Sequence, residues 1–230
     1  MKNMIGEKEL SMGEIFAYAF NIYKAKIKMI LFIILIISIP SNLIIDLLSP
    51  YSNKLGSELL KIIGVYIDVF IEVGAIYITY KYVNDEYVEC NQLCKAIFSR
   101  WKGIIWTTIV AGIILLGFSL LLVIPGVIFW IYYSFIFQAV VIKNLSGTDA
   151  LSYSKNLVKG YWWNLFIIQI LRIITAVIVI LPINFISKNV IYGVISNTSV
   201  HFVMIFFDVA ITICFFSLDS MKNKRDGTYI

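Results

Sequence analysis

Residues 162–186 read WWNLFIIQILRIITAVIVILPINFI, an apolar run that carries one charged residue, Arg172, near its middle. A helix rises about 1.5 Å per residue, so a run of this length can cross the roughly 30 Å hydrocarbon core of a bilayer. A charge at that depth is costly unless it meets a partner or a polar cavity. The run therefore predicts a membrane-spanning helix and marks Arg172 as a candidate site residue.

The composition of the whole chain is also typical of a membrane protein. Of 230 residues, 60% are hydrophobic and 14% are charged, against about 25% charged in a typical soluble domain. Apolar windows recur at about 29–48, 59–82, 104–123, 127–142, 162–186 and 198–218. We predict an all-α, polytopic fold with about six transmembrane helices in a single integral membrane domain, residues 1–230. The window at 127–142 is the shortest.

The basic residues are unevenly distributed between the predicted connections. Apart from Arg172, all of the 19 Lys and Arg residues except Lys54, Lys61 and Lys188 fall on one side of the topology. Cytoplasmic loops carry the excess of Lys and Arg, so both termini of this multi-pass protein are predicted to lie on the cytoplasmic side of the cell membrane. The net charge of +5 follows from this placement, and no nucleic acid partner is expected.

Three segments share a pattern that predicts a threefold internal repeat. Each ends in Lys followed by Ala or Gly, at Lys24, Lys102 and Lys159, and a spanning run follows. The repeat units would cover about 11–88, 89–144 and 146–220, each an interfacial amphipathic helix before a hairpin of two spans. These helices either orient the next span or sense lipid. The interfacial basic and aromatic residues are Lys24, Lys102, Lys159, Trp162 and Trp163.

Prolines and small polar residues predict the local breaks. Pro40 lies inside the first span and predicts a kink. Pro125 and Gly126 predict the turn between the third and fourth spans. Thr148 or Asp149 is expected to cap the third amphipathic helix, because their side-chain oxygens accept free amide hydrogens.

Polar side chains recur on single faces of the predicted spans. Asp68 and Glu72 share one face of the second span, and Asp208 lies on the polar face of the sixth. Glu72, Asp208 and Arg172 come to similar depths, about 15–17 Å from the cytoplasmic surface. We predict an intramembrane cluster of Arg172 with Glu72 and Asp208, with Asp68 one turn further out. Secondary polar lining is expected from His201, Thr212, Thr175 and Gln138.

This cluster has two possible interpretations, a structural clasp and a lined cavity. As a clasp it would fix the register of the helices, at roughly 1 kcal/mol for each interhelical polar contact. As a lined cavity it would bind a cation, a proton or a lipid headgroup. Three acids against one base leave an excess of negative charge, so at least one carboxyl is expected to be protonated.

Catalytic and metal-binding sets are not evident. The only histidine is His201, and neither a Gly-rich phosphate loop nor a Gly-x-Ser-x-Gly elbow occurs. Cys90 and Cys94 have no second ligand pair, and Cys214 lies in the last span. We therefore expect a protein that is not an enzyme, with no metal and no cofactor.

One part of the chain resembles a known family. Residues 121–129 read LLVIPGVIF, residues 132–135 read YYSF, and residues 150–163 read ALSYSKNLVKGYWW after Ser146-Gly147. Over about 115–170 this is similar to the membrane domain of the glycerophosphoryl diester phosphodiesterase family and its stand-alone six-helix bacterial relatives. The sequence departs from the family at Lys143, where an acidic residue is usual, and at Tyr153, where an Arg is usual.

The resemblance implies a multi-helix membrane module that handles lipids or anchors a partner. The catalytic barrel of that family has no counterpart in these residues, so phosphodiesterase activity is not implied.

The expected function is therefore a non-enzymatic membrane module that binds or helps translocate a lipid or amphipathic molecule, with Arg172 as the phosphate partner. Membrane lipids are the expected partners. One alternative is an accessory or immunity-type protein that acts through another membrane protein or a peptide. Another is a proton- or ion-coupled transporter in which Asp68, Glu72 and Asp208 act as relay groups.

Overall fold

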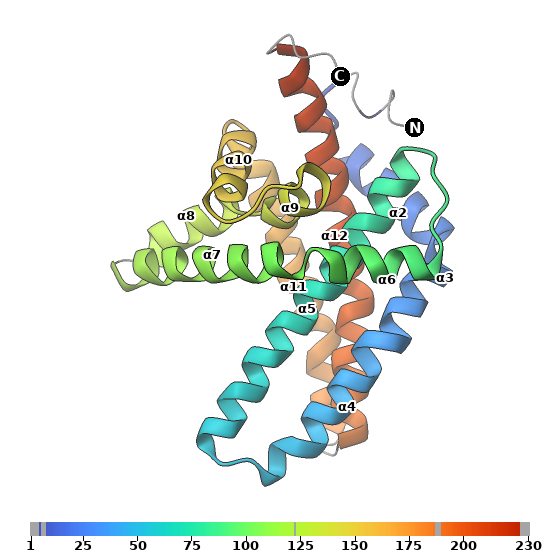
Figure 1. The fold of residues 1–230 in the computed structure, drawn as a ribbon, viewed down its shortest axis with the longest axis vertical. Coiled ribbons are helices and arrows are strands. Elements are labelled where there is room, and N and C mark those ends of the chain that lie inside the picture. The colour runs from blue at the N-terminus through green and yellow to red at the C-terminus, as the bar shows by residue number, and fades with distance from the viewer. Residues whose placement is uncertain (1–4, 6–7, 122, 187–189, 226–230) are drawn as a thin grey trace.

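In the computed structural model, the described residues are 5, 8–121, 123–186 and 190–225, and these form helices and no strand (Figure 1). The predicted all-α fold is confirmed. The elements in chain order are α2 (Met12–Ala25), α3 (Ile27–Ile33), the π-helical segment η1 (Ile34–Ser38), α4 (Ile39–Leu48), the 3₁₀ turn η2 (Ser49–Tyr51), α5 (Lys54–Val83), α6 (Cys90–Ser99), α7 (Trp101–Leu121), α8 (Val123–Tyr132), α9 (Ile136–Lys143), α10 (Thr148–Val158), α11 (Trp162–Ile186) and α12 (Val190–Arg225).

Several helices are long and apolar enough to cross a membrane, as expected for a multi-pass membrane protein. The five candidate spans within the described ranges are Ile27–Tyr51, Trp101–Ser119, Ile124–Lys143, Trp162–Pro182 and Gly193–Lys224. The remaining predicted span, 59–82, lies within the 30-residue helix α5, which is not among these five. A total of six spans therefore stays a prediction.

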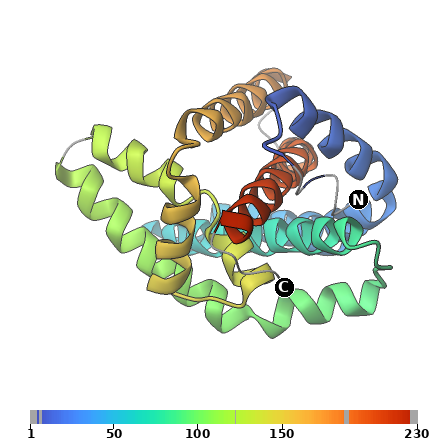
Figure 2. The ribbon, with the colours of Figure 1, turned by 90° about the horizontal axis from the view of Figure 1, so that it is seen from above.

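The helices form two hairpins along the molecule and one across it. The turn between α4 and α5 and the beginning of α12 lie at the lower end of Figure 1, whereas α2, α10 and the end of α12 lie toward the upper end. The α7–α8 hairpin runs across this long axis. Seen from above, α12 lies in the middle of the molecule (Figure 2), and it packs against α2, α4, α5 and α11.

This arrangement bears on the predicted asymmetry of charge. Lys54 begins α5 at the lower end (Figure 1), away from the basic segments of α2 and α10. Lys2 and Lys188, which the asymmetry also counts, lie outside the described residues.

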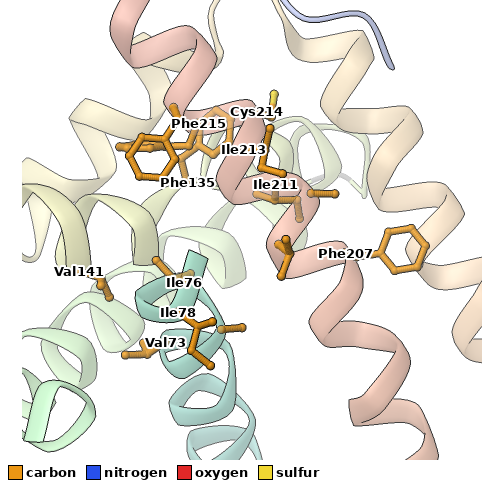
Figure 3. Packing of buried hydrophobic residues seen from close by; sticks show 14 of the residues in the cluster. Val73, Ile76, Ile78, Phe135, Val141, Phe207, Ile211, Ile213, Cys214 and Phe215 are labelled. Carbon is orange, nitrogen blue, oxygen red and sulfur yellow. The ribbon is translucent and has the colours of Figure 1, made fainter. Parts of the chain in front are cut away.

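Helices α12 and α5 contribute more buried residues to the core than any other helix. Figure 3 shows Phe215 and Ile213 of α12 beside Phe135, which precedes α9, with Ile76 of α5 below them. The Phe135 and Phe215 rings meet edge to face, with centroids 5.6 Å apart, an arrangement that adds attraction beyond the buried area. This packing fixes α12 against α9.

The three amphipathic helices are α2, α6 and α10, and each precedes one of the candidate spans. Two positions four residues apart are buried in each helix: Ile15 and Ala19, Leu93 and Ile97, and Ala150 and Ser154. The three helices thus present equivalent faces to the core. The repeat units 11–88, 89–144 and 146–220 stay a prediction.

The predicted irregularity at Pro40 is found as a change of helix type. Residues Ile34–Ser38 are π-helical, and the Ile39 N–H donates to the carbonyl of Ile34, five residues earlier. Proline has no N–H and its ring crowds the carbonyl four residues before it. The wider π turn relieves this conflict.

Two expected breaks are placed differently by the structure. Pro125 and Gly126 do not form the turn, because α8 already begins at Val123 and proline is tolerated in the first turn of a helix. Gly147, and neither Thr148 nor Asp149, is the N-cap of α10. Gly147 has φ +57°, and its N–H donates over 2.8 Å to the buried Thr107 hydroxyl. This bond holds the beginning of α10 against α7.

The predicted fourth span is interrupted between α8 and α9, and a side chain from α10 caps the interruption. The Ser154 hydroxyl donates to the Tyr132 carbonyl over 2.7 Å and accepts from the Phe135 N–H at 3.0 Å. Ser154 and Phe135 are fully buried. Because buried backbone groups need partners, Ser154 allows the chain to leave helical geometry here.

Replacing Ser154 with Ala should therefore lower the free energy of unfolding by about 1–3 kcal/mol, the usual effect of leaving a buried polar group without its partner. Chemical denaturation of the purified protein in mild detergent measures this loss. Ser152 lies on the exposed face of the same helix, so Ser152→Ala is the control and should change stability by less than about 0.5 kcal/mol. Equal losses in both variants would contradict the role given to Ser154.

Candidate intramembrane site

An ion pair joins the two helices of the last hairpin. Arg172 on α11 places Nη2 3.0 Å from Oδ1 of Asp208 on α12. The contact is close but is not aligned as a hydrogen bond, since the buried Oδ1 has no hydrogen-bond partner among the described residues. The guanidinium Nε also lies 3.2 Å from the Met204 sulfur, a weak acceptor. The predicted pairing of Arg172 with Asp208 is found.

Arg172 is only partly enclosed by this pairing. Its side chain is 24% exposed, against 3% for Asp208, and it lines a cavity of about 470 Å³. This volume falls within the roughly 300–1,000 Å³ of small-molecule sites. The guanidinium carries five N–H donors in a planar fork, so Asp208 and Met204 leave donors available to a ligand.

The rest of the cavity is mainly apolar. Its lining comes from α5, α7, the α8–α9 region, α11 and α12: Glu72, Thr108, Ala111, Gly112, Leu115, Trp130, Tyr133, Ser134, Ile136, Phe137, Gln169, Arg172, Ile173, Ala176, Met204 and Ile211. Ser134 and Gln169 are joined by a hydrogen bond of 3.3 Å. The cavity thus combines one charged end with an extended apolar wall.

Glu72 faces the same cavity from α5. Within the described parts of the chain, no hydrogen bond or ion pair reaches its carboxylate, although the cluster prediction placed it against Arg172. The two residues line the same space without an ion pair at 4.0 Å or less. Within the predicted cluster, Glu72 therefore shares the cavity with Arg172, and the ion pair is made by Asp208.

A second, smaller cavity of about 220 Å³ adjoins the first. Glu72, Arg172 and Met204 line both cavities, so these three side chains separate the two volumes. Asp68, His201 and Asp208 line only the smaller one. The polar groups therefore gather at the partition between two spaces.

Asp68 pairs with His201 and not with Arg172. Its Oδ1 lies 3.2 Å from Nε2 of His201, and its side chain is 61% exposed. The other ring nitrogen of His201, Nδ1, lies 3.2 Å from the Ser38 hydroxyl, which also accepts from Asn42. His201 thus belongs to a polar chain that joins α5, α12, η1 and α4. It lies beside the cluster at the smaller cavity.

The remaining predicted lining residues divide between the core and the helix surface. Thr212 donates to the Asp208 carbonyl over 2.7 Å, and the fully buried Gln138 donates to Thr212 over 3.4 Å. The Gln138 Oε1 atom is buried without a partner in the described structure. Thr175 was wrongly predicted as lining, because its hydroxyl donates to the Leu171 carbonyl of its own helix and it lines neither cavity.

One acidic residue was missed in the sequence. Asp46 on α4 has a buried Oδ2 with no partner among the described residues, and it lies so close to α12 that a Cβ on Gly193 would come within 2.7 Å of it. Asp46 lies near the end of an apolar run with no other charged residue beside it. An acidic residue at such a position is usually interpreted as part of the following turn. The close approach of Asp46 to Gly193, which is distant in the sequence, could not be predicted from the residues around either position.

The predicted interfacial residues lie apart from the cavities. Lys102 lies over the Trp101 ring, 5.6 Å from its centroid, and Trp162 donates from Nε1 to the Ile128 carbonyl over 3.3 Å. Lys159 lines a separate surface pocket with Lys222. Lys24 and Trp163 are exposed.

Next to the Lys159 pocket, the C-terminal part of α12 contacts α9 and α10. Asp219 lies 2.7 Å from Lys143 Nζ and accepts a hydrogen bond from the Tyr153 hydroxyl. Burial, together with this hydrogen bond, raises the pKa of Tyr153 above its ordinary value. The phenol therefore remains a donor at neutral pH. In the described ranges, no group of three or more His, Cys, Asp and Glu side chains is arranged to hold a metal.

Comparison with known proteins gives one match. A family model described as "Domain of unknown function (DUF7847)" matches residues 97–218, more than half of the chain. The matched region begins in α6 and includes Arg172 and Asp208. No curated protein and no solved structure matches the chain.

The ion pair can be tested by a double-mutant cycle. Asp208→Leu leaves the guanidinium without its acidic partner and should lower the free energy of unfolding by about 3 kcal/mol. Adding Arg172→Met removes the unpaired charge, so the double variant should be more stable than the sum of the single losses by about 1–3 kcal/mol. Chemical unfolding in detergent measures all three variants.

The exposed pair of Lys61 and Glu58, at 2.8 Å, gives a control cycle with a coupling of about 0–1 kcal/mol. Additive losses at Arg172 and Asp208 would contradict the proposed pairing.

Proposed function

This chain belongs to the family of the DUF7847 domain, whose description assigns no activity, and we propose from the geometry of the site that it is a non-enzymatic membrane module that binds a lipid or another amphipathic molecule. The cavity of about 470 Å³ would hold the ligand. Arg172 would bind an anionic group of the head, and the apolar wall would hold the tail.

One observation carries this proposal: the guanidinium of Arg172 opens into a cavity whose other walls are mostly apolar. A pure clasp needs its charges matched and closed off, because an open, desolvated charge is unfavourable. A guanidinium with free donors is suited to phosphate, which it can bind through two parallel hydrogen bonds. The same site would accept an acyl chain beside Ile173 and Leu115.

The proposed setting is the cell membrane, with six spans and both termini in the cytoplasm. The uneven placement of Lys and Arg supports this orientation, together with the position of Lys54 at the end of the molecule opposite α2 and α10 (Figure 1). The resemblance of residues 115–170 to the membrane domain of the glycerophosphoryl diester phosphodiesterase family stays a prediction.

A second candidate function, translocation of the same ligand, is favoured by the two adjoining cavities. They meet at Glu72, Arg172 and Met204, so a movement of these side chains would connect them. Asp208→Asn in liposomes tests a proton-coupled version of this function: loss of pH-driven flux with the fold preserved would support coupling, and unchanged flux would exclude Asp208 as a relay.

Lipid binding is tested by filling the cavity without altering its charges. Gly112 lines the cavity, and a Cβ added there meets nothing within 4 Å, so Gly112→Phe should fold and occupy the ligand's space. We expect a lipid adduct in native mass spectrometry of the wild-type protein. Its occupancy should fall roughly tenfold or more in Gly112→Phe, because the ring takes the space of the ligand. A similar loss is expected in Arg172→Gln, since charge-assisted hydrogen bonds contribute on this scale.

Gly117 provides a matched control, because it lies on the same helix with equal open space but outside the cavity lining. Gly117→Phe should keep the adduct. A wild-type protein without a lipid adduct, or equal occupancy of the adduct in all variants, would contradict the lipid proposal. A second polypeptide in place of lipid would favour the accessory, partner-binding function.

A further inference from the structure

The basic and the acidic side chain that line the larger cavity, Arg172 and Glu72, differ in whether they have a partner. Arg172 is the only cation among its described lining residues, and Asp208 already lies 3.0 Å from it. Glu72 adds a carboxylate that has no hydrogen bond or ion pair in the described structure. The site therefore offers a partly satisfied cation beside a carboxyl group without a hydrogen-bond or ion-pair partner.

A purely anionic headgroup fits this arrangement poorly. It would compete with Asp208 for the guanidinium, and it would bring no cation to the Glu72 carboxyl group in the same enclosed space. Like charges at short range repel strongly where water is excluded. An anionic ligand would thus gain one contact, lie close to Asp208 and leave Glu72 without a partner.

A ligand that carries both signs satisfies both groups. We propose that the cavity selects a zwitterionic headgroup, in which a phosphate binds Arg172 and an ammonium group binds the Glu72 carboxylate. This inference rests on the proposed function and names the class of lipid that the same site accepts. A carboxylate buried in an apolar wall becomes favourable once a cation and its hydrogen bonds meet it.

Other lining groups favour a primary ammonium. Its three N–H donors need oxygen acceptors, and the Ser134 hydroxyl and the Gln169 side chain line the cavity together with Glu72. Trp130 and Tyr133 add aromatic rings to the same wall, and ring faces attract cations. Asp68 takes no part, since it lines the smaller cavity and contacts His201.

The experiment compares two lipids with identical acyl chains, phosphatidylethanolamine and phosphatidylglycerol, by competition in native mass spectrometry with the full-length protein in detergent. We expect the wild-type protein to prefer phosphatidylethanolamine about tenfold. Glu72→Gln removes the acceptor charge and should abolish or reverse this preference while a lipid still binds. Arg172→Gln should lower binding of both lipids.

The control is Glu58→Gln, which removes one negative charge from the same helix α5 at an exposed position paired with Lys61. It should keep the wild-type preference. If Glu72→Gln does not fold, the wild-type comparison alone still decides. Equal binding of the two lipids, or a preference for phosphatidylglycerol, would overturn the zwitterion proposal and leave lipid binding intact. Absence of any lipid would instead overturn the proposed function itself.

Discussion

The organisation of this protein depends on placing one guanidinium inside an apolar bundle. Arg172 cannot be left unpaired among hydrocarbon side chains, and Asp208 on the neighbouring helix meets it at 3.0 Å. That contact fixes the rotation of α11 relative to α12, and α12 is the helix against which α2, α4 and α5 pack. The remaining polar groups are then arranged around the pair: Glu72 lines the same cavities as Arg172, and Thr212 and Gln138 continue from the Asp208 backbone into the core.

The cavity also depends on a local failure of helix geometry. Tyr133 and Ser134 can line it because the chain leaves the helix between α8 and α9. Backbone groups freed at such a break are tolerated in an apolar setting only when other groups satisfy them, and Ser154 does so from α10. The wall of the cavity and helix α10 are therefore held by the same hydroxyl. Helix α10 thus contributes to the cavity as well as preceding α11.

Much of this fold was predictable from the sequence, because long apolar windows and helical spacing are local properties. The all-α fold, the three short helices before apolar hairpins, the irregularity near Pro40 and the Arg172–Asp208 pair follow from length, period and depth. The positions that were missed depend on tertiary neighbours. Ser154 resembles any other helix residue in the sequence, because Phe135, whose N–H it accepts, is 19 residues away. The position of Gly147 depends likewise on its hydrogen bond to Thr107 of α7. Likewise, the Asp68–His201 contact required lateral positions that depth alone does not give.

The continuity of α12 has a mechanical consequence. Asp208 and Asp219 are separated by about three complete turns, so both project from nearly the same side of one unbroken helix. The first is tied to Arg172 and the second to Lys143 and Tyr153. Because α12 is one continuous helix, it cannot rotate at Asp208 without also rotating at Asp219. Any rotation of α12 that releases the guanidinium must also strain the contacts of Asp219 near the C-terminal end of the helix, so the cavity and that end of α12 are mechanically coupled.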